Sequence, residues 1–209
     1  MQKDLETVLK KAPVVPVLVI EAVESAVPLA KALVAGGLPV LEITLRTRAA
    51  ADCIRAIKAE VEGCIIGSGT VLDRDQLALS EKLGCAFAVS PGSSPKLLAA
   101  AKDHAIPLLP GAASASESMT LLEAGYVFQK FFPAEPAGGA AYLASLHSPL
   151  PQISFCPTGG ITPEKAPAYL KLANVITVGG SWMAPKAEIA RGNWAGITAL
   201  AKECAKPRG

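Results

Sequence analysis

Short apolar runs rich in β-branched residues recur along the 209-residue chain, about every 20–25 residues. Continuous apolar runs of this kind are typical of strands that are buried on both faces of a parallel sheet. The pattern predicts eight strands, which begin near Val14, Pro39, Cys64, Cys85, Ile106, Val127, Ile153 and Val175.

The segments between these runs have the pattern of amphipathic helices. The clearest is "EAVESAVPLAKALVAGG" at residues 21–37, which is apolar at every third or fourth position and ends in glycine. The pattern returns at residues 47–60, 73–84, 94–104, 115–125, 138–147 and 162–173. Strands therefore alternate with helices along the chain.

Eight strand–helix units predict an α/β fold, a (β/α)8 TIM barrel, with residues 1–209 forming a single domain. The charged segment "MQKDLETVLKKA" adds an extra N-terminal helix before the first strand. The alternative is an open doubly wound sheet, which usually carries G-x-G-x-x-G after its first strand. Here the first strand ends in "VLVIEAVES" without a glycine, which favours the barrel.

Composition and charge narrow the possible partners. The chain is 51% hydrophobic and 18% charged, which is typical of a folded globular protein. A net charge of +2 with scattered basic residues indicates no nucleic acid and no membrane partner. The apolar run "PVVPVLVI" is too short to span a bilayer and contains Pro16, and no cleavage site follows it, so we expect no signal peptide.

The cysteines and histidines exclude further classes of site. The chain has five cysteines and no C-x-x-C motif, which predicts reduced thiols and a cytoplasmic location. A nucleophilic cysteine needs a nearby base, but the two histidines, His104 and His147, fall near the ends of predicted helices. We therefore expect neither a Cys–His nucleophile nor a His-rich metal site.

Polar residues at the carboxyl ends of barrel strands are the candidates for catalysis. The second strand reads "VLEITLRT", and alternation points Glu42, Thr44 and Arg46 into the barrel while Leu41 and Ile43 face the helices. Two charges inside a barrel are a poor packing solution, although Glu42 and Arg46 could simply pair. Four residues span about 13 Å of strand, so Arg46 must lie past the strand end.

The stretch "QKFFPAE" places a lysine inside a run that otherwise predicts a buried strand. Alternation points Lys130 inward together with Phe128 and Phe132. A confined, partly apolar interior with a cation nearby favours a neutral amine, which is a nucleophile toward carbonyl carbons. The sequence thus predicts a lysine that forms a Schiff base; the alternative is a lysine that extends to solvent at the strand end.

Three other strands end in small polar residues or glycine. Thr70 ends "GSGT" after two glycines that allow close approach of another group, or it caps the next helix. "CPTGGIT" and "VGGSW" end the last two strands, where barrel enzymes often hold phosphate. The backbone N–H groups of Gly159, Gly160 and Gly180, with the Ser181 hydroxyl, are candidate anion donors.

Two rival functions remain open. A sugar-phosphate epimerase or isomerase would also bind phosphate, but the metal-dependent ones need inward histidine ligands, and this chain has no histidine on a predicted strand. A catalytically silent sugar-phosphate sensor would keep the glycine turns. It would have no reason to hold Lys130 and Glu42 together inside the barrel.

Taken in order and spacing, "LEITLRT", "GSGTV", "SPG", "KFFPAE", "CPTGGI" and "GGSW" resemble the KDPG/KHG aldolases over essentially the whole chain. These class I aldolases cleave 2-keto-3-deoxy-6-phosphogluconate (KDPG) of the Entner-Doudoroff pathway, or 2-keto-4-hydroxyglutarate (KHG). The resemblance implies a TIM barrel, a homotrimer, no metal, no cofactor and a keto-acid phosphate as substrate. Gln129 departs from the family pattern, but it is expected to point away from the interior.

The resemblance also implies a role for each matching residue. Lys130 would form the Schiff base and Glu42 would be the general acid and base. Arg46 and Thr70 would bind the substrate carboxylate, and the phosphate would lie on Gly159, Gly160, Gly180 and Ser181. The substrate pocket would be lined by Pro91, Phe132 and Thr158.

Overall fold

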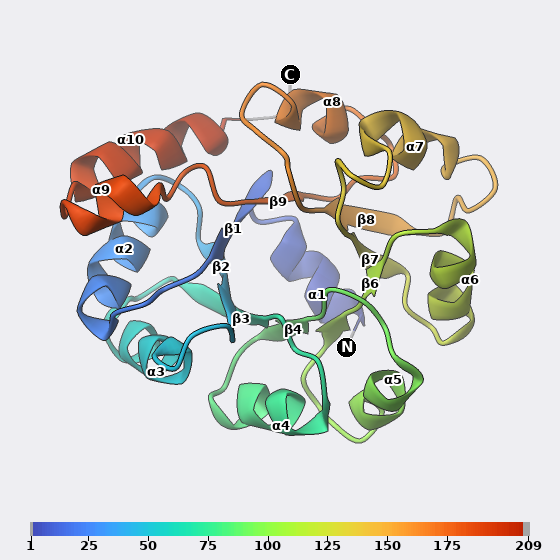
Figure 1. Cartoon of the computed structure of the whole chain (residues 1–209), viewed down its shortest axis with the longest axis horizontal. Coiled ribbons are helices and arrows are strands. Elements are labelled where there is room, and N and C mark those ends of the chain that lie inside the picture. The colour runs from blue at the N-terminus through green and yellow to red at the C-terminus, as the bar shows by residue number, and fades with distance from the viewer. Residues whose placement is uncertain (1, 207–209) are drawn as a thin grey trace.

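The computed structural model describes residues 2–206, with side chains from residue 4 onward. Parallel strands curl into a barrel, and helices form a ring around it (Figure 1). The strands fall into a six-stranded sheet in the order β5-β4-β3-β2-β1-β9 and a three-stranded sheet in the order β6-β7-β8. Their bounds are β1 Val14–Leu18, β2 Val40–Thr44, β3 Ile65–Gly69, β4 Phe87–Val89, β5 Leu108–Leu109, β6 Gly111–Ala112, β7 Phe128–Phe131, β8 Ser154–Pro157 and β9 Val178–Gly180.

The two sheets join to close the barrel. Pro110, which has no N–H group, divides the predicted fifth strand into β5 and β6, and its carbonyl accepts a hydrogen bond of 2.8 Å from Lys130 N. A bridge from Thr158 to Gly179 joins the end of β8 to β9, and a bridge from Phe155 to Val175 joins β8 to the segment before β9. The (β/α)8 barrel is therefore confirmed. The last strand begins at Val178, later than predicted, because Val175 makes only an isolated bridge.

Each predicted helical segment contains a helix that follows a strand. Several begin where a side chain caps the first turn: Asp73 accepts from Gln76 N, and Ser94 accepts from Leu97 N. The helices are α1 Gln2–Leu9, α2 Val23–Ala35, α3 Ala50–Glu60, α4 Arg74–Lys82, α5 Pro95–Ala101, α6 Ala115–Glu123, α7 Gly139–Ser145, α8 Ala166–Leu170, α9 Lys186–Ala190 and α10 Trp194–Cys204. None in the described part of the chain is long and apolar enough to cross a membrane.

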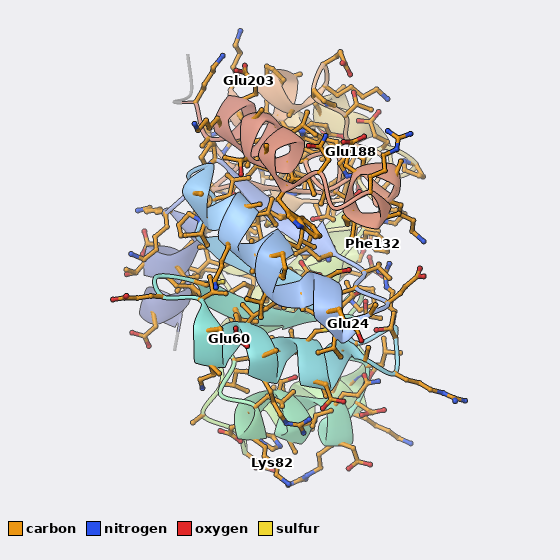
Figure 2. The ribbon with its side chains drawn as sticks, turned by 90° about the vertical axis from the view of Figure 1, so that its left-hand side faces the viewer. Glu24, Glu60, Lys82, Phe132, Glu188 and Glu203 are labelled. Carbon is orange, nitrogen blue, oxygen red and sulfur yellow. The ribbon has the colours of Figure 1, made fainter. Side chains whose placement is uncertain are left out.

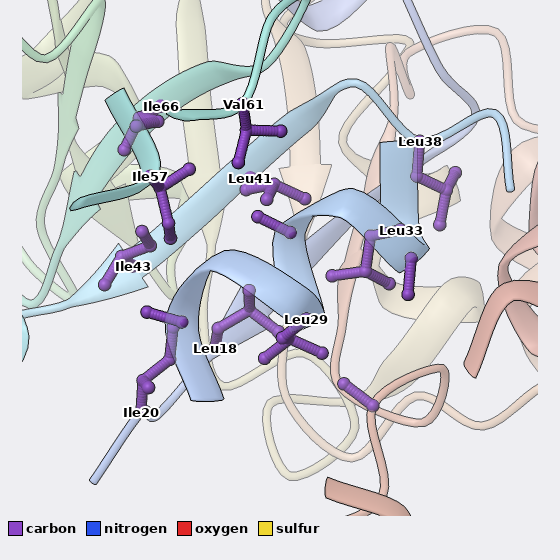
Figure 3. Close-up of a cluster of buried hydrophobic side chains, with 14 of the residues drawn as sticks. Leu18, Ile20, Leu29, Leu33, Leu38, Leu41, Ile43, Ile57, Val61 and Ile66 are labelled. Atoms are coloured by element: carbon purple, nitrogen blue, oxygen red, sulfur yellow. The ribbon is translucent and has the colours of Figure 1, made fainter. Parts of the chain in front are cut away.

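The helix layer packs on the outer face of the strands as the alternation of β2 predicts. Leu41 and Ile43 lie in one buried cluster with Leu29 from α2 and Ile57 from α3 (Figure 3). All four side chains are fully buried. This face of β2 is therefore committed to packing, which leaves its other face for the barrel interior.

The extra N-terminal helix is confirmed, and it closes the amino-terminal end of the barrel. Leu5 and Leu9 of α1 are buried in a cluster with residues that point inward from the strands, among them Val40, Phe87 and Phe128. In the view down the barrel, α1 lies within the ring of outer helices (Figure 1). The amino-terminal half of the interior is thus apolar.

The opposite end of the barrel is the one where chemistry is expected. Figure 2 shows Phe132, just past β7, on the same side as Glu24 at the start of α2, whereas Glu60 at the end of α3 lies on the other side. Helices that follow strands begin at the carboxyl ends of those strands. Phe132 therefore marks the carboxyl-terminal end of the barrel.

We predict that Leu5→Ala destabilises the fold by about 2–5 kcal/mol, because it opens a cavity in a site that α1 and the strands enclose. Urea unfolding measures the change. Lys10→Ala is the matched control on the same segment; its exposed side chain pairs with Glu6, and we expect a change within about 0.5 kcal/mol. Equal losses in the two variants would contradict the sealing role of α1.

Candidate active site

Lys130 and Glu42 meet inside the barrel. Lys130 lies on β7 and Glu42 on β2, and Lys130 Nζ lies 3.2 Å from Glu42 Oε1 and 3.5 Å from Oε2. The two side chains are only 4% and 5% exposed. A buried ion pair of this kind stabilises a fold poorly compared with apolar side chains, so its presence indicates a functional constraint.

Glycines on β3 make room for this pair and for the apolar layer beneath it. A Cβ atom at Gly69 would lie 2.3 Å from Glu42 Oε1, and one at Gly67 would lie 2.2 Å from the Phe87 ring. Neither position could carry a side chain unless its neighbour moved. The close approach predicted from the two glycines of "GSGT" is confirmed, and the group that approaches Gly69 is the Glu42 carboxylate.

The residues of β7 alternate between the interior and the helix layer. Lys130 Nζ lies 5.4 Å from the centroid of the Phe132 ring, a cation–π distance. Phe131 faces the other way and stacks on Tyr142 of α7. Gln129 also faces the helices and donates to the carbonyls of Ser118 and Tyr126. The lysine is therefore held between an apolar ring and a carboxylate.

The charged group that contacts Lys130 is an anion. We expected a cation nearby, which stays a prediction; the ion-pair partner of Lys130 is the Glu42 carboxylate. Arg46 lies beyond the end of β2 and is exposed, as its distance along the strand required. The pair can therefore exchange a proton between the ammonium group and the carboxylate, which releases a neutral amine.

Cys156 is a third titratable group in this interior. It pairs with Lys130 in the β7–β8 register and is buried. Burial raises the pKa of its thiol to about 12, and the nearby Lys130 only partly opposes this effect. The thiol therefore stays protonated at neutral pH and contributes packing.

Arg46 and Thr70 are brought together past the ends of β2 and β3. Arg46 Nε donates a hydrogen bond of 2.8 Å to Thr70 Oγ1. Thr70 has a φ of +60°, which is uncommon for a residue other than glycine. Such conformations cost free energy and gather at functional sites. The arrangement leaves the remaining guanidinium N–H groups of Arg46 able to bind a carboxylate in a bidentate manner.

The two glycine turns also lie side by side. The bridge between Thr158 and Gly179 brings the end of β8 next to β9, so Gly159 and Gly160 lie near Gly180 and Ser181. Gly159 and Gly160 have φ values of +106° and +76°, which favour glycine. Gly160 and Ser181 are exposed, whereas Gly180 is buried against the Trp182 ring. Their arrangement suits backbone donation to an anion.

The three residues expected to line the pocket are at the same end of the barrel. Phe132 lies beside Lys130, and Thr158 follows β8. Pro91 follows β4, and its carbonyl oxygen would lie 2.3 Å from a Cβ atom at Gly111, the residue that pairs with Lys130.

The sequence did not predict a role for a further glycine in this region. A Cβ atom at Gly179 would lie 2.2 Å from Thr158 Oγ1, so the glycine leaves room for the Thr158 side chain. The only signal was the pairing of Gly179 with Gly180 in "VGGSW". Of that pair, only Gly180 was expected to have a role, as a phosphate donor.

Among the side chains that the structure describes, no group of three His, Cys, Asp or Glu residues could hold a metal ion. The described groups at this end that could react with or bind a substrate are an amine, a carboxylate, a guanidinium and two glycine turns. An amine beside a carboxylate can form an imine with a keto acid and move protons on it.

Comparisons with known proteins show which family the chain resembles. The model of the family described as KDPG and KHG aldolase matches residues 5–200. A 2-dehydro-3-deoxy-phosphogluconate aldolase from Pseudoalteromonas atlantica is 52% identical over 95% of this chain and 92% of its own length. The KHG/KDPG aldolase of Escherichia coli K12 is 49% identical over 95% of this chain and 93% of its own.

Solved structures share the whole fold. The 2-keto-3-deoxy-6-phosphogluconate aldolase of Zymomonas mobilis ZM4, solved with 3-phosphoglycerate, has a TM-score of 0.93, 47% identity, and coverage of 98% of this chain and 96% of its own. KDPG aldolase from Legionella pneumophila, solved with pyruvate as a covalent carbinolamine intermediate, has a TM-score of 0.93, 44% identity, and coverage of 96% and 98%. The chain therefore belongs to the KDPG and KHG aldolase family.

Proposed function

We propose that this protein is a class I aldolase that cleaves KDPG to pyruvate and D-glyceraldehyde 3-phosphate. The observation that carries the proposal is the buried contact of 3.2 Å between Lys130 Nζ and Glu42 Oε1 inside the barrel. The names of the Pseudoalteromonas and Zymomonas relatives support the substrate. The name of the E. coli relative supports a second reaction, cleavage of 4-hydroxy-2-oxoglutarate to pyruvate and glyoxylate.

The mechanism begins with a proton transfer inside the pair. Lys130 gives a proton to Glu42, and its neutral amine attacks C2 of the keto acid to form a carbinolamine. Glu42 returns that proton to the carbinolamine hydroxyl, which leaves as water and gives an iminium. Glu42, as the carboxylate, removes the C4 hydroxyl proton directly or through a water. The C3–C4 bond breaks, its electrons flow into the iminium, and the aldehyde leaves behind an enamine.

The second half of the cycle returns the protein to its starting state. Glu42 gives its proton to C3 of the enamine, which regenerates an iminium. Water adds to C2, and loss of the amine releases pyruvate and Lys130. A positioned acid and base contributes roughly 10²–10⁴ to the rate, and one carboxylate serves both steps because it faces the same bound carbons.

The ends of the substrate are bound by different chemistry. Arg46 would make a bidentate contact with the C1 carboxylate, and its hydrogen bond to Thr70 supports this role. The distal phosphate would lie on the turns of Gly159, Gly160, Gly180 and Ser181. The 3-phosphoglycerate in the Zymomonas structure supports a phosphate-binding site in this family. Pro91, Phe132 and Thr158 would enclose the carbons between the two anionic groups.

Three broader proposals rest on the sequence and the relationship. We propose a homotrimer, by resemblance to the family. We also propose a cytoplasmic location, which the free state of all five cysteines supports, since disulfides are rare there. The assignment of residues 1–209 to one domain stays a prediction.

We predict that Lys130 carries the imine. Incubation with pyruvate and borohydride should add one reduced pyruvyl group, which mass spectrometry maps to the peptide containing Lys130. Lys130→Met should abolish the adduct. Lys165→Met, which removes a lysine that pairs with Glu135, should keep it. An adduct on another lysine would contradict the mechanism.

Glu42→Gln should block proton transfer and leave imine formation partly intact, because the amide cannot act as a base. NMR should show exchange of the pyruvate methyl protons in D₂O slowing by roughly 10²-fold or more. Glu81→Gln is the control, since Glu81 accepts hydrogen bonds from His104 and Ala105 away from the barrel interior. Exchange at the wild-type rate in Glu42→Gln would remove Glu42 from the mechanism.

Variants of the glycine turns should discriminate between phosphorylated and unphosphorylated substrates. Ser181→Ala removes one donor to a charged group, so kcat/KM for KDPG should fall about ten- to a hundred-fold. Gly160→Val should cost more, because a Cβ atom there meets Glu135 Cβ at 2.9 Å.

The matched control for the glycine is Gly63→Val. Gly63 has a φ of +75°, close to that of Gly160, but nothing lies within 4 Å of its Cβ position. KHG, which has no phosphate, should be cleaved by Ser181→Ala and Gly160→Val at close to the wild-type rate. Equal losses on the two substrates would show that these turns support the barrel in general.

Light scattering should give a mass about three times that of the 21.4-kDa chain. The trimer rests on the family relationship, so it is independent of the site chemistry. A monomeric mass at the concentrations used for activity measurements would overturn it.

A further inference from the structure

Glu135 connects the strand that carries Lys130 to the first glycine turn. It lies five residues after Lys130, and its backbone N donates a hydrogen bond of 3.0 Å to the carbonyl of Gly159. The preceding residue, Ala134, donates one of 2.8 Å to the carbonyl of Thr158. The backbone after β7 thus runs alongside the turn after β8 and holds its carbonyl groups.

The side chain of Glu135 continues along the same turn. A Cβ atom at Gly160 would lie 2.9 Å from Glu135 Cβ and 3.0 Å from its Cγ, so the backbone of Gly160 packs directly on this side chain. Gly160 has a φ of +76°. Because glycine adopts positive and negative φ about equally readily, the groups around Gly160 decide which conformation it takes. The stem of Glu135 is therefore one wall of the turn.

The carboxylate of Glu135 holds the segment that follows the turn. It accepts a hydrogen bond of 2.5 Å from Lys165 Nζ and another of 2.5 Å from the Tyr169 hydroxyl. Tyr169 of α8 is 1% exposed, and the Glu135 side chain is 24% exposed. A buried phenol needs an acceptor, and Glu135 provides it.

The protonation states of the two groups suit this bond. The hydrogen bond from Lys165, followed by that from Tyr169, holds the pKa of Glu135 below its ordinary value, so the carboxylate is ionised at neutral pH. Burial, with Glu135 adding to it, raises the pKa of Tyr169 well above its ordinary value, so the phenol remains a donor. The contact is thus a charge-assisted hydrogen bond.

We propose that Glu135 is a positioning residue that fixes the Gly159–Gly160 turn for the substrate's phosphate and ties it to the strand of Lys130. Its backbone and stem hold the beginning of segment 159–169, and its carboxylate holds the end. The inference rests on the proposed function, because the phosphate site is assigned there. Glu135 contacts the turn and α8, and acts on the substrate through the turn.

The test is a split between KM and kcat in Glu135→Gln, which keeps the volume of the side chain and removes its charge. KM for KDPG should rise about ten-fold, because a small displacement of a binding group is costly. The values of kcat for KDPG and of kcat/KM for KHG should stay within about two-fold of wild type. Tyr169→Phe, which removes one of the two donors, should shift KM for KDPG in the same direction by less.

Two controls separate positioning from other effects. Glu81→Gln also removes a carboxylate with two donors, but on α4, and should change neither constant. Lys165→Met removes the positive charge and leaves the Tyr169 bond. If Lys165→Met raises KM as much as Glu135→Gln while Tyr169→Phe does not, the ammonium charge serves the phosphate and the positioning role is overturned.

The remaining outcomes also decide the question. Equal losses on KDPG and KHG, or no loss on KDPG, in Glu135→Gln would overturn the inference while leaving the aldolase in place. If Glu135→Gln does not fold, Tyr169→Phe carries the same test on the two substrates. A wild-type protein that shows no preference for KDPG over KHG would end the phosphate assignment itself, and the role of Glu135 with it.

Discussion

The contact between the Lys130 amine and the Glu42 carboxylate is the constraint on which the carboxyl-terminal half of the barrel interior depends. Both groups are almost completely removed from water. No apolar side chain in either position could attack a carbonyl carbon or transfer a proton. Held apart, each would be a buried unpaired charge at a cost of several kcal/mol. Held together, they stabilise one another and provide a proton donor and acceptor at one point.

The rest of the interior is arranged around this contact. Gly69 leaves the space that the Glu42 carboxylate occupies, and Gly67 leaves space for the Phe87 ring in the apolar layer below. The layer is completed by α1, whose Leu5 and Leu9 seal the amino-terminal end. Among the described residues, the open approach for water is therefore from the carboxyl-terminal end, where we propose that the loops bind the substrate.

The sequence predicted the barrel, its N-terminal helix and the inward direction of Glu42 and Lys130, because strand alternation and helix periodicity are local properties of the chain. It failed where the answer depended on distant segments. No local pattern shows which charged side chain contacts Lys130, since β2, which carries Glu42, lies far from β7 in the sequence. Likewise, the hydrogen bond from Tyr169 to Glu135 spans 34 residues. The sequence around Tyr169 predicted an amphipathic helix and no partner for its hydroxyl.

A crystal structure of the protein soaked with pyruvate tests the central claim most directly. The account predicts continuous electron density from Lys130 Nζ to C2 of pyruvate, with a Glu42 oxygen within hydrogen-bonding reach of the methyl carbon or of a water beside it, and the pyruvate carboxylate near Arg46. Pyruvate bound without a covalent link while Lys130 remains paired with Glu42, or density joined to any other lysine, would contradict it.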